Sequence, residues 1–137
     1  MRRSILSTAL LVLPLLYLVP TTLAAAPDPK APPRVTAKEL TAAYVKDPVA
    51  AGKVYGDPYA LREVIVEGIV DQVVDGKYGK IARLKGTGKV VVSCLLRKED
   101  VDLVKPGEKV VIRGRCRGFF EKDNLVDING GVVQKAP

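Results

Sequence analysis

The sequence carries few side chains that could perform covalent or acid–base chemistry. Its 137 residues include no histidine and only two cysteines, Cys94 and Cys116. Without an imidazole, the chain lacks the usual general base and the relay of a serine or cysteine hydrolase. Two thiols are too few for a four-thiolate zinc site. We therefore expect a protein that is not an enzyme and that uses no cofactor and no metal.

The two cysteines could form a disulfide. Alternation along the predicted strands places Cys94 on the same face as Val92 and Leu96. It places Cys116 with Ile112, so both thiols are expected to face inward. A bridge between them would close a loop of about 20 residues and stabilise the fold by roughly 3 kcal/mol in the chain-entropy model. The alternative is two small buried thiols whose Cα atoms lie beyond the ~7 Å that a disulfide can span.

Basic side chains on the predicted strands indicate an anion-binding surface. Lys and Arg total 22 against 15 Asp and Glu, which gives a net charge of +7. Arg113, Arg115 and Arg117 alternate with inward-facing residues and so share one outward face. Basic residues beside an aromatic ring are also what single-strand nucleic-acid binding requires. The candidate binding face consists of Tyr78, Lys80, Arg83, Lys85, Lys89, Arg113, Arg115 and Arg117.

Two other patterns predict no site. The acids Asp71, Asp75, Asp123 and Asp127 stand singly near turns and lack the spacing of a calcium loop, so we interpret them as solvated. The segment 86–89, Gly-Thr-Gly-Lys, joins two predicted strands, whereas a phosphate-binding loop opens a helix.

The N-terminus has the pattern of a secretory signal peptide. Two arginines precede the apolar run 5–19, and small residues follow it. The run is shorter than the roughly 20 apolar residues of a membrane span. Cleavage is expected to remove residues 1–24, which takes away two arginines and no acid and lowers the net charge from +7 to +5. The mature protein is then secreted or periplasmic, without a membrane span, and since disulfides persist there we predict the Cys94–Cys116 bridge.

After the signal peptide, the sequence predicts short helices followed by strands. Residues 25–34 contain four prolines and indicate an extended lead-in. Thr36 and Glu39 form a capping-box pattern for one helix, and Asp47 precedes a proline that begins a second. The strands are expected at 63–74, 80–85, 89–96, 109–117 and 124–128, with 132–133 as a candidate continuation and a short helix at 97–104.

This order of elements favours a mainly β architecture. Five strands with a short helix between the third and fourth fit a Greek-key OB-fold barrel, whose closure leaves no exposed strand edge. Gly68 supports the barrel, because the first strand must bend. The alternative is a half-open sandwich. Residues 35–137 are thus predicted to form one OB-fold domain with an N-terminal helical segment.

Several motifs resemble a known family. They are Leu40-x-x-Ala43-Tyr44, Val66-x-Gly68-Ile69-Val70, Val92-x-Cys94 and, most specifically, Leu103-x-x-Pro106-Gly107-x-x-Val110-x-Ile112-x-Gly114-x-Cys116-x-Gly118. Through them, residues 35 to about 133 resemble the tRNA-anticodon-binding-like OB-fold family of small bacterial secreted proteins and lipoproteins. The resemblance implies an OB-fold and no settled biochemical activity.

The leading hypothesis is an exported binding module whose ligand is a protein or an anionic envelope polymer. Binding of single-stranded oligonucleotides is the alternative. Two observations weigh against nucleic acid as the ligand. Aromatic residues make up 5% of the chain, and Tyr78, Phe119 and Phe120 stand at strand ends. Export also separates the protein from cytoplasmic nucleic acid.

Overall fold

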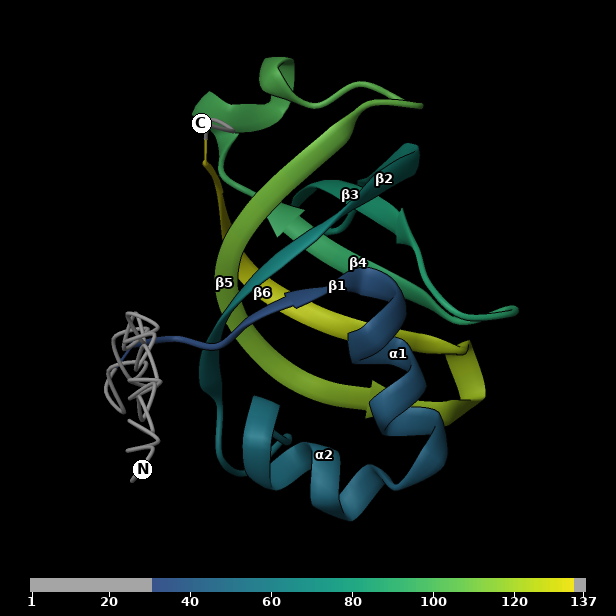
Figure 1. Ribbon diagram of the computed structural model, residues 1–137. Helices are drawn as coiled ribbons and strands as arrows, with labels where there is room; N and C mark the ends of the chain where they lie inside the picture. The colour runs from purple at the N-terminus through teal and green to yellow at the C-terminus, as the bar shows by residue number, and fades with distance from the viewer. Residues whose placement is uncertain (1–30, 135–137) are drawn as a thin grey trace, which may run out of the picture.

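The computed structural model describes residues 31–134, which form a mainly β structure with two helices near its N-terminus. The predicted signal peptide at 1–24 and most of the lead-in lie outside the described residues. Within 31–134, no helix is long and apolar enough to cross a membrane. The elements are β1 (Arg34–Thr36), α1 (Ala37–Lys46), α2 (Pro48–Tyr55), β2 (Arg62–Gly76), β3 (Gly79–Lys85), β4 (Val91–Leu96), β5 (Lys109–Phe120) and β6 (Leu125–Gln134), with short 3-10 helices at Lys98–Leu103 and Glu121–Asp123 (Figure 1).

Both helices begin where their capping residues predict. The Thr36 hydroxyl accepts a hydrogen bond from the Glu39 amide, and the Glu39 carboxylate accepts one from the Thr36 amide, each at 3.1 Å. At the next helix, the Asp47 carboxylate accepts from the Ala50 amide at 3.0 Å, with a proline in the first turn. These local bonds satisfy backbone donors that a helix start leaves free, and they confirm the predicted capping box.

Five of the six strands close into a ring. Neighbouring strands follow the order β2, β3, β4, β6, β5, and β5 pairs again with β2. The 15 residues of β2 make this closure possible, because its first half pairs with β5 and its second half with β3. The β4–β6 pair is parallel and the other ring pairs are antiparallel. Figure 1 shows β5 curving around the ring.

The sixth strand, β1, corrects the predicted count of five. It has three residues and pairs in parallel with residues 65–67 of β2. Such a short segment, between the lead-in and a helix cap, is too brief to show the alternation that identifies a strand.

A β-bulge shapes the contact between β5 and β6. Arg113 pairs with Val132 and Arg115 pairs with Asn129, so two residues of β6 lie opposite Gly114 alone. The two residues on the β6 side of the bulge, 130 and 131, are both glycine. Gly130 has a φ of 65°, in the left-handed region that glycine adopts readily. The bulge bends β6 where its outer face carries polar side chains.

Inward-facing residues of the strands fill the ring. The largest fully buried strand residues are Val64, Val66, Val70, Leu84, Val92, Ile112, Val126 and Ile128. Two side chains of α1, Leu40 and Tyr44, are also fully buried and cover one end of this core. The helical segment is therefore part of the folded unit.

The two cysteines face inward as expected but remain free thiols. Both Cys94 and Cys116 pair with Ile128, from opposite sides of β6. Two strand spacings amount to about 9–10 Å, which exceeds the ~7 Å limit for a disulfide. The predicted bridge is therefore absent, because β6 lies between the strands that carry the thiols. Burial raises the pKa of both cysteines, so they stay protonated at neutral pH.

Candidate binding groove on the outer face of β5 and β6

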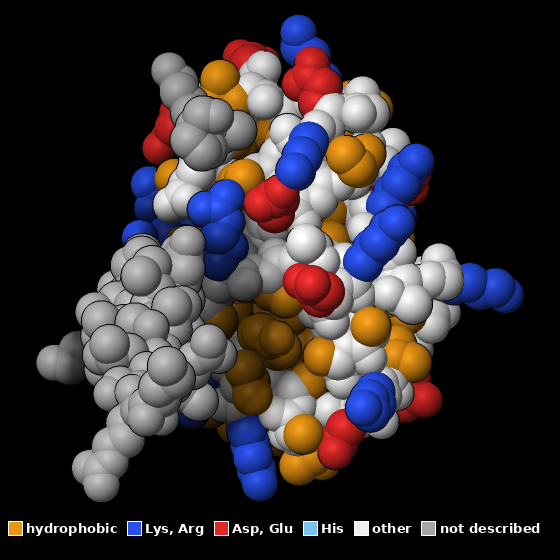
Figure 2. Space-filling view, in the orientation of Figure 1, with side chains coloured by type: hydrophobic (Ala, Val, Ile, Leu, Met, Phe, Trp, Pro, Cys, Tyr) orange, Lys and Arg blue, Asp and Glu red, His pale blue; other side chains and the backbone are white. Residues whose placement is uncertain are grey.

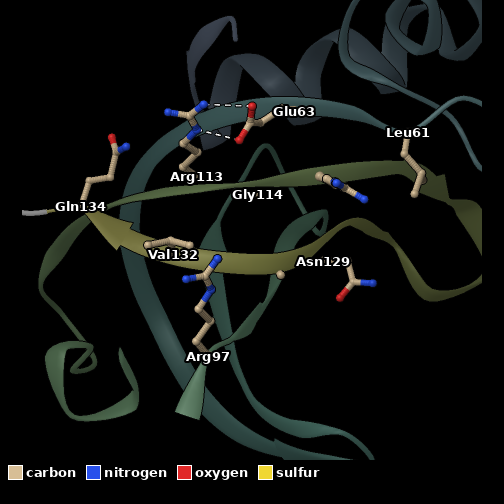
Figure 3. Close-up of a pocket in the computed structure, with 10 residues that line it drawn as sticks. Leu61, Glu63, Arg97, Arg113, Gly114, Asn129, Val132 and Gln134 are labelled. Atoms are coloured by element: carbon tan, nitrogen blue, oxygen red, sulfur yellow. Dashed lines mark hydrogen bonds and ion pairs between the residues drawn. The ribbon is translucent and has the colours of Figure 1, made fainter. Parts of the chain in front are cut away.

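A groove of about 660 Å³ lies over the outer face where β5 and β6 pair. We call it the basic groove because arginines dominate its charged side chains. Its lining residues are Leu61, Glu63, Arg97, Arg113, Gly114, Arg115, Asn129, Gly130, Val132 and Gln134. Figure 3 shows the Arg97 side chain extending to β6 beside Val132, with Glu63 and Arg113 joined by hydrogen bonds on the other side of that strand.

Strand register brings the polar groups of the groove together. Arg115 of β5 lies between Glu63 of β2 and Asn129 of β6. Arg97 arrives from the segment directly after β4, where its amide donates to the Gly131 carbonyl at 3.2 Å. The groove therefore combines residues of β2, β5 and β6 with one residue that follows β4. Closure of the ring brings these four strands to one surface.

One arginine of the groove is neutralised within the fold. The Nε and Nη2 atoms of Arg113 donate to the two carboxylate oxygens of Glu63 at 2.6 and 3.0 Å. This forked hydrogen bonding lowers the pKa of Glu63 and raises that of Arg113. Within residues 31–134, Arg97 and Arg115 form no ion pair with a carboxylate. The groove thus offers an anion two guanidinium groups that are not held in an ion pair, although the Glu63 carboxylate also interacts electrostatically with Arg115.

The Glu63–Arg113 pair predicts a specific pH dependence of stability. Because the pKa of Glu63 is lowered in the folded state, the pair stabilises the fold above the ordinary glutamate pKa of 4.5 and loses that effect as pH falls through the lowered pKa. Both side chains are nearly half exposed, so solvent screening keeps the contribution small. Urea unfolding at neutral and acid pH should show Glu63→Gln destabilised at neutral pH and equal to wild type at acid pH. A deficit of the same size at both pH values contradicts this assignment, and Glu121→Gln, an exposed site outside the described ion pairs, serves as control.

A second, smaller hollow of about 200 Å³ adjoins the basic groove. We call it the tyrosine hollow, and its lining residues are Lys77, Tyr78, Ile81, Leu95, Arg117, Asp127 and Asn129. Asn129 lines both depressions. The two hollows are therefore neighbours on one surface.

The tyrosine hollow combines an exposed ring with an apolar floor. Tyr78, in the turn between β2 and β3, is 78% exposed, and the Lys77 ammonium lies 5.3 Å from the centre of its ring. Ile81 of β3 pairs with Leu95 of β4, and both are half-buried. The hollow can thus hold a flat or partly apolar group against hydrocarbon.

Asp127 is not the solvated turn acid that the sequence pattern predicts. It lies within β6, its side chain is 22% exposed, and its carboxylate accepts from Arg117 at 3.1 Å. Burial raises its pKa, an effect that the nearby Arg117 guanidinium partly offsets. Asp127 therefore acts as a fixed hydrogen-bond acceptor at the edge of the tyrosine hollow.

The predicted binding face divides in two. Arg113 and Arg115 line the basic groove, and Tyr78 and Arg117 line the tyrosine hollow, whereas Lys80, Arg83, Lys85 and Lys89 line neither. The Lys80 ammonium pairs with Asp75 at 2.5 Å, and the Nε atom of Arg83 is buried with no hydrogen-bond partner among the described residues. Lys85 and Lys89 flank the exposed turn between β3 and β4. A role for these residues in binding stays a prediction.

Several residues that line the basic groove were not predicted from the sequence. Glu63 and Asn129 could have been found from alternation, since each lies on the outward side of its strand. Arg97 gave no such signal, because only the strand order brings the end of β4 beside β6. Among residues 31–134, no three His, Cys, Asp or Glu side chains are grouped to hold a metal ion. The site offers charge, hydrogen bonds and an aromatic ring.

The face that carries the helices has a different character. In Figure 2, hydrophobic side chains gather at its centre and lower part, whereas Lys and Arg stand singly around them. Exposed apolar residues of the helical segment include Val45, Val49 and Val54. Where the face is visible beside the grey atoms, its basic residues stand apart from one another, so it is a weaker candidate for anion binding.

Comparisons with known proteins agree with this architecture. The model of the family described as tRNA_anti-like matches residues 9–128. No curated protein matches the chain. Among solved structures, the fold is similar to a lipoprotein from Klebsiella pneumoniae subsp. pneumoniae MGH 78578, provisionally named as nucleic acid-binding. The two share 15% identity and a TM-score of 0.56 over 73% of this chain and 91% of the other. At that identity the likeness concerns the fold alone.

Proposed function

The chain belongs to the tRNA_anti-like family, and we propose that it is an exported, non-enzymatic OB-fold module that binds an anionic ligand in the basic groove. The strand ring supports the OB-fold part of this proposal. Its order β2, β3, β4, β6, β5, with a short helix between β4 and β5, matches a five-stranded Greek-key barrel with β1 added. The apolar N-terminal run and the lipoprotein character of the similar structure support export.

The observation that carries the proposal is the pair of arginines that form no ion pair among the described residues. Arg97 and Arg115 line a groove whose single carboxylate, on Glu63, is already engaged by Arg113. A guanidinium binds carboxylate, sulfate or phosphate groups through forked hydrogen bonds. The ligand is accordingly an acidic envelope polymer or an acidic segment of a partner protein.

Arg115→Ala is expected to weaken binding of an anionic polymer about tenfold, since it removes one charge-assisted contact. The probes are polyglutamate, alginate and polyphosphate, measured by fluorescence anisotropy at about 50 mM salt, where electrostatic binding is strong. Lys85→Ala is the matched control: it removes the same charge outside the groove, so its affinity should stay within about twofold of wild type. Equal losses in the two variants, or no binding of any probe, contradict the proposed function.

Single-stranded nucleic acid is the second candidate ligand. It is favoured by the exposed ring of Tyr78 beside Lys77 and by the name of the similar lipoprotein. In that case an oligothymidylate should bind more tightly than the other probes, with an affinity that falls steeply as salt rises. No binding of the oligonucleotide at about 50 mM salt removes this candidate.

A further inference from the structure

We propose that the basic groove and the tyrosine hollow are two subsites of one site, and that the site binds an acidic polysaccharide. The inference rests on the proposed function and names the ligand class for it. Its basis is a single row of side chains across the outer surface of the ring, in which the chemical character changes in order from apolar to charged.

The row is fixed by strand register. Ile81 pairs with Leu95, and Arg115 pairs with both Asn129 and Glu63. Leu95 lies beside Asn129, because its neighbours Cys94 and Leu96 pair with Ile128 and Gly131 of β6. The row Ile81, Leu95, Asn129, Arg115, Glu63 thus follows the outside of the closed ring over five strands, a curved path of about 19 Å at the usual spacing. A chain-like ligand that follows this curved surface can contact both hollows.

Each part of the row offers a different contact. Tyr78, Ile81 and Leu95 present ring and hydrocarbon, which match the carbon–hydrogen face of a sugar ring. The amide of Asn129, shared by both hollows, can donate and accept hydrogen bonds, as sugar hydroxyls also can. Arg115 then meets a carboxylate on the next part of the ligand.

The two carboxylates of the site favour a sugar over a nucleic acid. Glu63 lines the basic groove and Asp127 lines the tyrosine hollow. Carboxylate oxygens accept hydrogen bonds, which the many hydroxyl groups of a sugar can donate, whereas the phosphodiester groups of a nucleic acid have no donor. Stacking of successive bases also needs several aromatic platforms, and Tyr78 is the one aromatic side chain that lines either hollow among the described residues.

The test compares an oligogalacturonate, its neutral methyl ester and an oligothymidylate on the full mature chain. Wild type should bind the acidic sugar at least about tenfold more tightly than the ester, since the ester lacks the charge that Arg115 meets. Tyr78→Ala should weaken both sugars about fivefold, because its contact is with the ring itself. Arg115→Ala should weaken only the acidic sugar. Tyr59→Ala is the matched control, because Tyr59 is fully exposed and lines neither hollow.

The outcomes separate this inference from the proposed function. If Arg115→Ala weakens an anionic probe while Tyr78→Ala behaves as Tyr59→Ala, the groove binds anions and the two-subsite inference is wrong. Tighter binding of the oligothymidylate than of the oligogalacturonate also overturns the inference and leaves the anion site standing. If no probe depends on Arg115, the proposed function itself fails. Circular dichroism of each variant verifies that a lost affinity is not a lost fold.

Discussion

Tyr44→Ala is expected to lower the free energy of unfolding by about 3–5 kcal/mol, which is the usual cost of deleting a large buried aromatic side chain. Tyr44 is 1% exposed and belongs to α1. Its hydroxyl donates to the Gly56 carbonyl at 2.5 Å, at the end of α2, and lies 3.3 Å from the Cys116 sulfur of β5. The ring contributes as well, with Phe119 of β5 at 6.4 Å between centroids. One side chain therefore joins both helices to the strand ring.

The effect can be divided between ring and hydroxyl. Tyr44→Phe keeps the ring and leaves the Gly56 carbonyl without its donor, so it should cost about 1–3 kcal/mol. Burial raises the pKa of Tyr44 well above its usual value, so the hydroxyl remains a donor across the working pH range. Urea unfolding followed by circular dichroism measures both variants. A cost below about 1 kcal/mol for Tyr44→Ala would show that the helices are not tied to the ring by this residue.

Local signals in the sequence were enough to locate the helices and most strands. Thr36 with Glu39, and Asp47 with its following proline, act on backbone groups within one turn, so their pattern is readable without a tertiary structure. Alternation identified which side of β5 faces outward, because side chains of a strand alternate whatever its partners are. The short strand β1 depends instead on a partner about 30 residues away, and its own three residues carry no periodic signal.

Features that depend on strand order could not be predicted. The inward orientation of Cys94 and Cys116 was correct, yet their separation depends on β6 lying between β4 and β5. The same arrangement places Asn129 beside Arg115 and brings Arg97 to the groove. The alternation of side chains along a strand predicts which face of the sheet a residue occupies. It does not predict which other strand lies beside that residue.

The close contact between β5 and β6 leads to the second large effect, in which Gly114→Val is expected to lower both stability and ligand affinity. A Cβ atom at Gly114 would lie 2.6 Å from Cγ2 of Ile128 and 3.0 Å from the Asn129 carbonyl oxygen. Ile128 is fully buried and cannot swing away, so β6 must move outward. Overpacking of this kind costs about 1–3 kcal/mol or more, and the movement also shifts Asn129 away from Arg115, its partner across the strands. We expect unfolding at lower urea concentration together with at least about tenfold weaker binding, since a displacement of the supporting strand separates contacts that act together.

A double-mutant cycle with Ile128→Ala decides whether this clash is the cause. If Gly114→Val acts through a clash with the Ile128 methyl group, truncating Ile128 should relieve that clash. The destabilisations of the two single variants should then sum to at least about 1 kcal/mol more than the destabilisation of the double variant. Gly107→Asn is the control for a glycine change as such, because no atom lies within 4 Å of a Cβ there and Asn tolerates its left-handed φ of 87°. Additive effects in the cycle would mean that the Ile128 methyl group is not the cause and that Gly114→Val acts through its other close contact, the Asn129 carbonyl oxygen of β6, or through the backbone of β5. In that case binding should not recover in the double variant.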